Sequence, residues 1–126
     1  MSVINYLLEK LKEVEPNFVY NLSLSLHRNP DDFEDGDISD RIFQYEYYIL
    51  DNQFPISNLD LEEWEVQPYL VNDFIRQYKQ NSDYPPIVIG KDNEMFTIID
   101  GIHRANALHE LGLKTVKAYV GYNATS

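Results

Sequence analysis

Residues 84–121, YPPIVIGKDNEMFTIIDGIHRANALHELGLKTVKAYVG, decide the fold class because strand and helix patterns alternate along them. Two short runs rich in apolar and β-branched residues, YPPIVIG and MFTIID, flank the tight turn KDNE and predict two neighbouring strands. The segment IHRANALHELG predicts a helix. It ends at Gly112, where a left-handed residue is favoured, and Lys114 complements the end of the helix dipole. A third strand follows in KTVKAYVG, so we expect a small α+β domain with a mixed sheet.

The turn between the second strand and the helix, DGIHR at residues 100–104, is the candidate ligand site. A helix N-terminus exposes backbone N–H groups and a partial positive charge, which favour anions. Gly101 has no Cβ, so the turn can adopt an unusual backbone angle and a ligand can approach the main chain. His103 and Arg104 add side-chain donors that suit phosphate oxygens. The alternative is a structural turn in which Arg104 pairs with Asp100 and His103 caps the helix.

The residues before this region predict further elements. Residues 67–80 carry helical spacing after a proline, a residue favoured in a first turn. The run RIFQYEYYILD at 41–51 is typical of a strand, with its tyrosines either packed or exposed as a stacking surface. FVYNLSLSL at 18–26 alternates like a half-buried strand. Residues 2–14 have the spacing of an amphipathic helix that ends at Pro16.

One domain is expected, because 126 residues with 44% hydrophobic content fill one core and not comfortably two. We divide it into an N-terminal helix and strand extension at 1–53, a core at 54–121 and a tail at 122–126. The chain has no cysteine, which excludes disulfides, thiolate metal sites and a cysteine nucleophile. No run approaches the roughly 18 apolar residues that span a bilayer. We therefore expect a cytoplasmic protein without membrane contact.

Negative charge is concentrated in the front of the chain. Residues 1–83 carry six basic and seventeen acidic side chains, which account for the formal net charge of −11. Direct nucleic-acid binding is not expected, because it needs several phosphates neutralised by Lys or Arg. The acidic segment at 27–40 predicts a solvated loop. Its match to a calcium-binding loop fails, because Phe33 replaces an oxygen ligand and Ile42 replaces the closing glutamate.

The order of the predicted elements and the motifs within residues 54–121 resemble those of the ParB/sulfiredoxin-like superfamily. Its members carry a strand led by a Pro-Pro-Ile type segment and a hairpin strand that ends in Gly-x-His-Arg or Gly-x-Arg-Arg. An alanine-containing helix, a glycine and a strand similar to TVKAYV follow. The resemblance implies that the turn holds the phosphates of ATP or ADP. By position the residues of this turn are Gly101, Ile102, His103 and Arg104.

Departures from the family pattern narrow what the resemblance implies. Sulfiredoxins use a cysteine at the second motif position as nucleophile, and Ile102 stands there, so sulfiredoxin activity is excluded. ParB partitioning proteins continue into a helix-turn-helix and a dimerisation domain, which we do not expect after Val120. Small stand-alone members, many of them from phages and plasmids, are often described as ParB-like nucleases. The negative charge disfavours a nuclease.

Free serine kinases of the superfamily use a glutamate just after the segment that corresponds to PISNL. The stretch DLEEWE offers three candidates near this place, with Glu63 the closest by count: Glu62, Glu63 and Glu65. A carboxylate beside a bound phosphate can act as a base or hold Mg²⁺. The alternative is a charged first turn that complements a helix dipole.

Two functions therefore stay open. In the first, the protein is a phosphotransferase or nucleotide hydrolase that uses ATP or ADP, with or without Mg²⁺. His103 and one of the glutamates act in catalysis, Asp100 orients Arg104, and Arg104→Ala is expected to abolish nucleotide binding without unfolding the chain. In the second, the protein is an acidic, non-catalytic module that mimics nucleic acid and binds a basic host defence protein. Its candidate contact residues are Asp31, Asp32, Glu34, Asp35 and Asp37.

Overall fold

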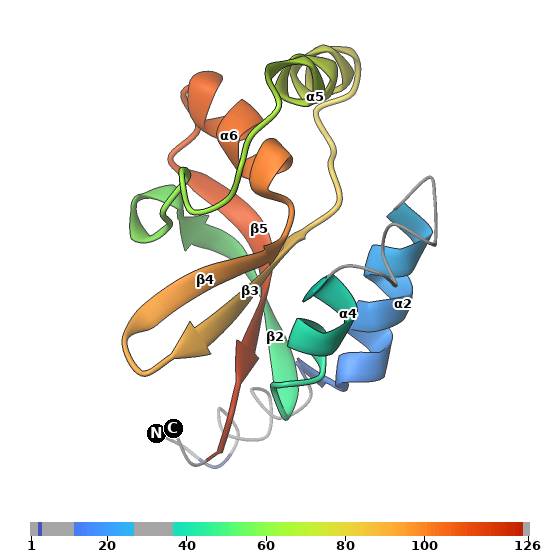
Figure 1. Cartoon of the computed structure of the whole chain (residues 1–126), viewed down its shortest axis with the longest axis vertical. Helices are drawn as coiled ribbons and strands as arrows, with labels where there is room; N and C mark the ends of the chain where they lie inside the picture. The colour runs from blue at the N-terminus through green and yellow to red at the C-terminus, as the bar shows by residue number, and fades with distance from the viewer. Residues whose placement is uncertain (1–2, 4–11, 27–36, 125–126) are drawn as a thin grey trace.

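The computed structural model describes residues 3, 12–26 and 37–124, which form a five-stranded mixed sheet with helices on both faces (Figure 1). The strands are β1 (Glu13–Val14), β2 (Tyr47–Pro55), β3 (Ile87–Asp92), β4 (Met95–Asp100) and β5 (Thr115–Tyr122). The helices are α2 (Pro16–Leu26), α4 (Asp37–Ile42), α5 (Pro68–Gln80) and α6 (Ile102–Glu110), with a 3-10 turn η1 (Ile56–Asn58). The strand order is β1-β2-β5-β3-β4, with β3 and β5 parallel and the other neighbours antiparallel.

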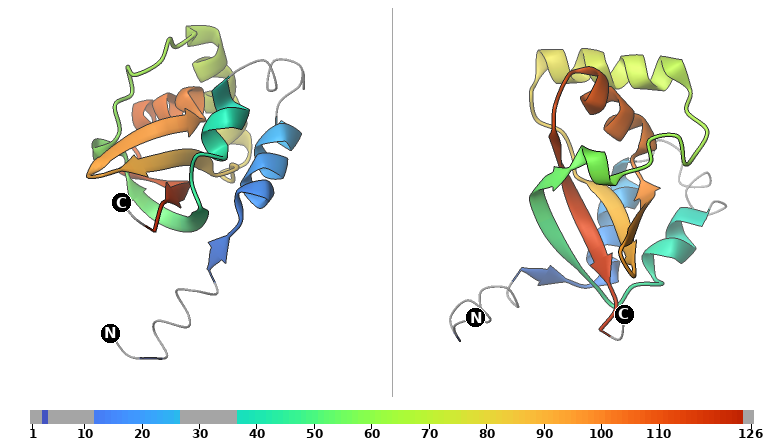
Figure 2. Two further views of the ribbon diagram at one scale, coloured as in Figure 1. Left: turned by 60° about the horizontal axis from the view of Figure 1, so that its bottom comes forward. Right: turned by 90° about the vertical axis from the view of Figure 1, so that its left-hand side faces the viewer.

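The two faces of the sheet have separate apolar cores. On β3, Ile87 and Ile89 belong to the core beneath α6, and Val88 belongs to the core beneath α2 and α4. This division follows from the alternation of side chains along a strand. The helix α5 packs on α6 on one side of the sheet, and α2 and α4 lie on the other side (Figure 2). The chain therefore forms three layers, helix on sheet on helix.

The elements after residue 66 confirm the sequence-based predictions. The helix predicted at 67–80 is α5, and the hairpin, helix and third strand are β3, β4, α6 and β5. Asn93 takes a left-handed conformation (φ 58°) in the tight turn, and Gly112 does so (φ 87°) after the end of α6. The predicted α+β class with a mixed sheet is confirmed.

The strand predicted at residues 18–26 is wrong, because these residues belong to α2. Pro16, which the sequence suggested as the end of an earlier helix, is the first residue of α2, where proline is favoured. The residues that α2 buries are Val19 and Ser23, four positions apart on one helical face. The alternation of leucine with polar residues therefore did not predict which face of α2 is buried.

The strand predicted at 41–51 is shifted in the structure. Residues 37–42, placed in the predicted acidic loop and at the start of that strand, form α4, and β2 begins at Tyr47 and runs to Pro55. Ile42 is fully buried at the end of α4, so this apolar side chain belongs to a helix end and not to a strand. The rest of the loop, residues 27–36, lies outside the described residues, and with it Phe33, one of the two residues tested against a calcium loop.

The tyrosines of this run are packed. Tyr45 and Tyr48 are buried, and Tyr47 stacks on Tyr122 of the neighbouring strand with ring centroids 5.6 Å apart. The hydroxyl of Tyr45 donates to Asp92 Oδ2 at 2.8 Å, and burial raises the pKa of Tyr45 to about 12. The packed interpretation of the tyrosines is therefore correct.

The N-terminal predictions fall partly outside the described residues. Most of the helix predicted at 2–14 lies there, and Glu13–Val14 form strand β1, which pairs with β2. The proposed boundary between residues 53 and 54 falls inside β2, which pairs with β5 from Tyr47 to Pro55. No helix in the described part of the chain is long and apolar enough to cross a membrane.

Candidate functional site

A groove of about 960 Å³ lies where β4 ends and α6 begins. Its lining comes from α5 and the start of α6, from the loop before α5, and from α2 and α4. In Figure 1 these elements are α5 and α6 at the top and α2 and α4 at the lower right. Pockets of a few hundred to about a thousand Å³ are typical of small-molecule sites. The predicted turn, residues 100–104, forms part of this lining.

Gly101 gives the turn its backbone conformation. It is the N-cap of α6 with φ 108° and ψ 25°, a left-handed conformation that glycine tolerates. A Cβ at this position would lie 2.6 Å from Ile87 Cγ2 and 3.1 Å from Arg104 Nη2. The register between β3 and β4 also shifts by one residue at Ile99, which forms a bulge directly before the turn. The expectation of an unusual backbone angle at Gly101 is confirmed.

The first backbone amides of α6 face no acceptor in the described part of the chain. Ala105 N–H donates to Gly101 O, which closes the first turn of the helix. The amides of Ile102, His103 and Arg104 have no described partner, as expected at a helix start. All three residues line the groove.

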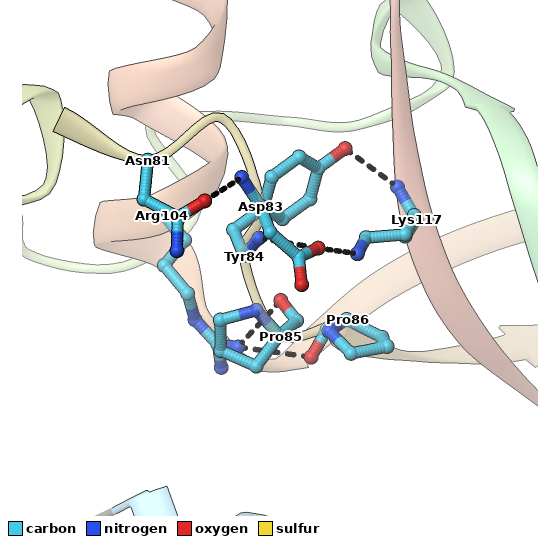
Figure 3. A network of polar contacts seen from close by, with 7 residues as sticks. All are labelled: Asn81, Asp83, Tyr84, Pro85, Pro86, Arg104 and Lys117. Carbon is cyan, nitrogen blue, oxygen red and sulfur yellow. Dashed lines mark hydrogen bonds and ion pairs between the residues drawn. The ribbon is translucent and has the colours of Figure 1, made fainter. Parts of the chain in front are cut away.

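Arg104 is largely buried and holds the segment that leads into β3. Its side chain is 6% exposed, and Nη1 donates to Pro85 O at 3.0 Å and to Pro86 O at 2.9 Å (Figure 3). Its Nη2 lies 3.6 Å from Asp100 Oδ2, the pairing that the sequence suggested. Burial lowers the pKa of the guanidinium, and Asp100 opposes this shift.

The same segment is fixed from its other side. Lys117 Nζ donates to Asp83 Oδ1 at 2.7 Å, and the Lys117 backbone amide donates to the hydroxyl of Tyr84 (Figure 3). The hydrogen bond from Lys117 lowers the pKa of the exposed Asp83 carboxyl. Arg104 therefore links α6 to the segment 83–86, which Lys117 holds from the other side. Arg104 Nη2, beside Asp100, makes no hydrogen bond to a backbone carbonyl of the described residues.

His103 faces the start of α5 with a defined tautomer. Its Nε2 accepts the backbone N–H of Gln67, the N-cap of α5, at 3.1 Å. A backbone amide can only donate, so Nε2 carries no proton and the neutral ring carries its proton on Nδ1. Burial lowers the pKa of His103, which favours the same neutral form. His103 thus offers one N–H at Nδ1 and no charge.

The three glutamates of DLEEWE are not part of the groove lining, but the tryptophan among them is. Glu63 Oε2 accepts the backbone N–H of Ile98 at 3.2 Å, and Trp64 Nε1 donates to Ile98 O at 2.9 Å. These two bonds satisfy the N–H and C=O of Ile98 at the outer edge of β4, the last strand of the sheet. Glu62 and Glu65 are exposed, and no group of three or more metal-ligating side chains gathers in the described part of the chain.

Among the groove residues that the sequence did not indicate as part of a site are Arg41, Trp64 and Tyr69. The Arg41 guanidinium lies over the Trp64 ring, 4.7 Å from its centroid, and Tyr69 is 65% exposed at the start of α5. The signal that could have indicated Trp64 is that it is the one tryptophan of the chain and lies beside the glutamates considered as bases. Arg41 lay in a run interpreted as a strand, so no signal pointed to it.

Comparison with known proteins identifies the fold. The sequence matches no family model and no curated protein. Among solved structures, sulfiredoxin from Arabidopsis thaliana superposes with a TM-score of 0.51 at 17% identity, over 60% of this chain and 86% of that chain. This chain has the ParB/sulfiredoxin-like fold.

Within the ParB/sulfiredoxin-like fold, this chain differs from sulfiredoxins at the position that matters most for their chemistry. The family resemblance places a cysteine nucleophile where Ile102 stands, at the first helical residue after Gly101. The structural likeness, at 17% identity, shows the fold and gives no information about the activity of this chain.

Proposed function

We propose that the protein binds a nucleotide in this groove, with a phosphate on the amides at the start of α6. The observation that carries the proposal is the coincidence of three features in one cavity. The amides of Ile102, His103 and Arg104 have no described partner, and Trp64 and Tyr69 offer aromatic surface to the same space. Unpaired amides at a helix start suit a phosphate, and aromatic rings suit a nucleobase.

The neutral state of His103 fits this role. An imidazole with its proton on Nδ1 can donate one hydrogen bond to a phosphate oxygen. Arg104 acts mainly as a positioning residue, because its Nη1 is occupied by Pro85 O and Pro86 O. Its Nη2, beside Asp100, is the group that we expect to reach a ligand. The backbone amides therefore carry most of the proposed phosphate contact.

We propose phosphoryl transfer or nucleotide hydrolysis as the reaction, with Glu63 as the base. Glu63 does not itself line the groove, but its carboxylate accepts the N–H of Ile98, and both Ile98 and the adjacent Trp64 line it. Mg²⁺ would arrive with the nucleotide and be held by its phosphates and by one or two carboxylates. Glu63→Gln keeps an acceptor for Ile98 N–H and removes the base. We expect this variant to bind ADP like the parent and to lose turnover of ATP.

The binding proposal is tested by calorimetric titration of ATP and ADP, with and without Mg²⁺, into the parent, His103→Gln and His103→Glu. Both substitutions keep an oxygen that can accept the Gln67 amide, and an acidic residue in a first helical turn is compatible with stability. The glutamate places a negative charge beside the expected phosphate. We expect His103→Glu to bind at least about tenfold more weakly than His103→Gln.

Equal affinity of the two variants would show that the phosphate does not lie on α6. Absence of binding by the parent would exclude the nucleotide proposal, and the acidic front of the chain would then become the surface to test for a basic protein partner. Thermal unfolding of each variant controls for loss of structure. Arg104→Ala is a poor test, because its buried guanidinium supports the connection to β3.

A further inference from the structure

Arg41 brings a positive charge to the groove from the α4 side of the sheet. It lies in the last turn of α4, with its guanidinium carbon 4.7 Å from the centre of the Trp64 ring. Trp64 is itself fixed by its hydrogen bond to Ile98 O. An aromatic face thus holds Arg41 against the wall of the groove.

The other charges of the groove lining are already matched. Arg104 lies beside Asp100, and Asp73 forms an ion pair with Arg76 of the same helix. Within the described residues, no carboxylate lies within 4 Å of the Arg41 guanidinium. The chain has more than twice as many acidic as basic side chains, so a groove-facing arginine with no acidic partner among the described residues points to an anionic ligand.

We propose that Arg41 contacts the second phosphate of a nucleoside diphosphate or triphosphate, so that the groove selects these ligands over monophosphates. The inference rests on the proposed function, in which another phosphate lies at the start of α6. A guanidinium fork matches phosphate oxygens in two parallel hydrogen bonds. A cation–π contact with a partly exposed ring is weaker than paired hydrogen bonds to a phosphate, so Arg41 leaves Trp64 when the ligand binds. A monophosphate engages one anion-binding point and leaves Arg41 on Trp64.

The test is a titration of ADP and of AMP into the full chain, with the fluorescence of Trp64 as the signal. Trp64 is the sole tryptophan and lines the groove, so its emission reports on this site. The variants are Arg41→Gln and, as a control, Lys79→Gln. Lys79 is exposed on α5 outside the groove lining, and its substitution makes the same change in net charge.

We expect the parent and Lys79→Gln to bind ADP at least about tenfold more tightly than AMP. Arg41→Gln is expected to lose this preference while its affinity for AMP stays near that of the parent. Retained AMP binding also shows that the variant is folded.

Three outcomes overturn the inference and leave nucleotide binding in place. They are a parent that binds ADP and AMP alike, an Arg41→Gln variant that keeps the preference for ADP, and an Arg41→Gln variant that weakens both ligands equally. In the last case Arg41 acts on the Trp64 wall and not on a phosphate. A parent that binds neither nucleotide removes the proposed function and this inference together.

Discussion

Gly101 is the residue on which the geometry of the site depends most directly. Two separate constraints act on it, a left-handed backbone and a side chain, Ile87, packed against its Cα. Gly112 is left-handed too, but no atom lies within 4 Å of the position of its Cβ. Comparing alanine variants of Gly101 and Gly112 therefore separates the energetic cost of the left-handed backbone from the cost of a Cβ contact with Ile87.

We predict that Gly101→Ala destabilises the protein by about 2 to 4 kcal/mol, because strain and overpacking add. Gly112→Ala carries only the strain and is expected to cost about 1 kcal/mol. Urea unfolding of both variants measures the difference. Equal losses would mean that Ile87 moves aside and that glycine is required at 101 for its backbone angle alone.

We predict that His103 makes the stability of the fold depend on pH. Burial lowers its pKa in the folded state, so below about pH 6.5 the unfolded chain takes up a proton more readily than the folded chain. This difference favours unfolding, so the free energy of unfolding falls as the pH drops from the unfolded pKa toward the lowered folded pKa. Above the unfolded pKa both states are neutral, and no effect of His103 on stability is expected.

The measurement compares urea midpoints of the parent and His103→Gln at pH 7.5 and 5.5. The glutamine does not titrate and can still accept the Gln67 amide, so the parent should lose more stability than the variant on acidification. The other titrating groups are common to both proteins and cancel in the comparison. An identical pH dependence would show that His103 is protonated as easily in the folded chain as in the unfolded one.

Residue patterns predicted the turn but not the environment of its side chains. Gly101 and its left-handed angle follow from the need to pass from a strand directly into a helix. The burial of Arg104 could not be predicted in this way, because its partners Pro85 and Pro86 are distant in sequence and reach it through tertiary packing. A site arginine and a structural arginine look the same in a sequence.

At the scale of elements, the loop at residues 59–66 serves as a cover for the edge of the sheet. Glu63 and Trp64 bind the N–H and C=O of Ile98, and Asn106 Nδ2 donates to Leu61 O. An edge strand otherwise presents unpaired backbone groups to other chains. The same loop thereby brings Trp64 to the groove, so edge protection and site formation depend on one segment.

We predict that Trp64→Phe lowers the free energy of unfolding by about 0.5 to 1.5 kcal/mol, the contribution of a typical hydrogen bond. Glu63→Gln, which keeps an acceptor for Ile98 N–H, should cost less. Circular dichroism in urea is the measurement, because Trp64→Phe removes the sole tryptophan signal. If Trp64→Phe is neutral, the indole does not hold the loop on β4.

Elements were predictable where local pattern and tertiary burial agree. In α5, β3, β4 and α6 the apolar spacing and the capping residues indicate the same structure. In α2 they disagree, since leucines alternate like a strand while Pro16 begins a helix that buries Val19 and Ser23. Ser23 illustrates the limit, because the alternation places it on the face opposite the leucines, whereas the residue is 1% exposed in α2.

At the scale of the whole molecule, the fold joins two regions that the sequence analysis treated separately. The groove takes the Gly101 turn from the β4–α6 connection and Arg41, which has no acidic partner among the described residues, from α4 on the opposite face of the sheet. The acidic composition of residues 1–83 gave no hint of this arginine. Its placement depends on long-range packing, which a charge count does not contain.

We propose above all that a phosphate lies on the first amides of α6. Nitrogen–proton correlation spectra of the labelled protein, recorded while ADP is added, test this placement. We expect the largest shifts at the backbone amides of Ile102, His103 and Arg104 and at the indole N–H of Trp64. If these four signals stay in place at an ADP concentration that shifts others, or if no signal moves, the phosphate does not lie on α6.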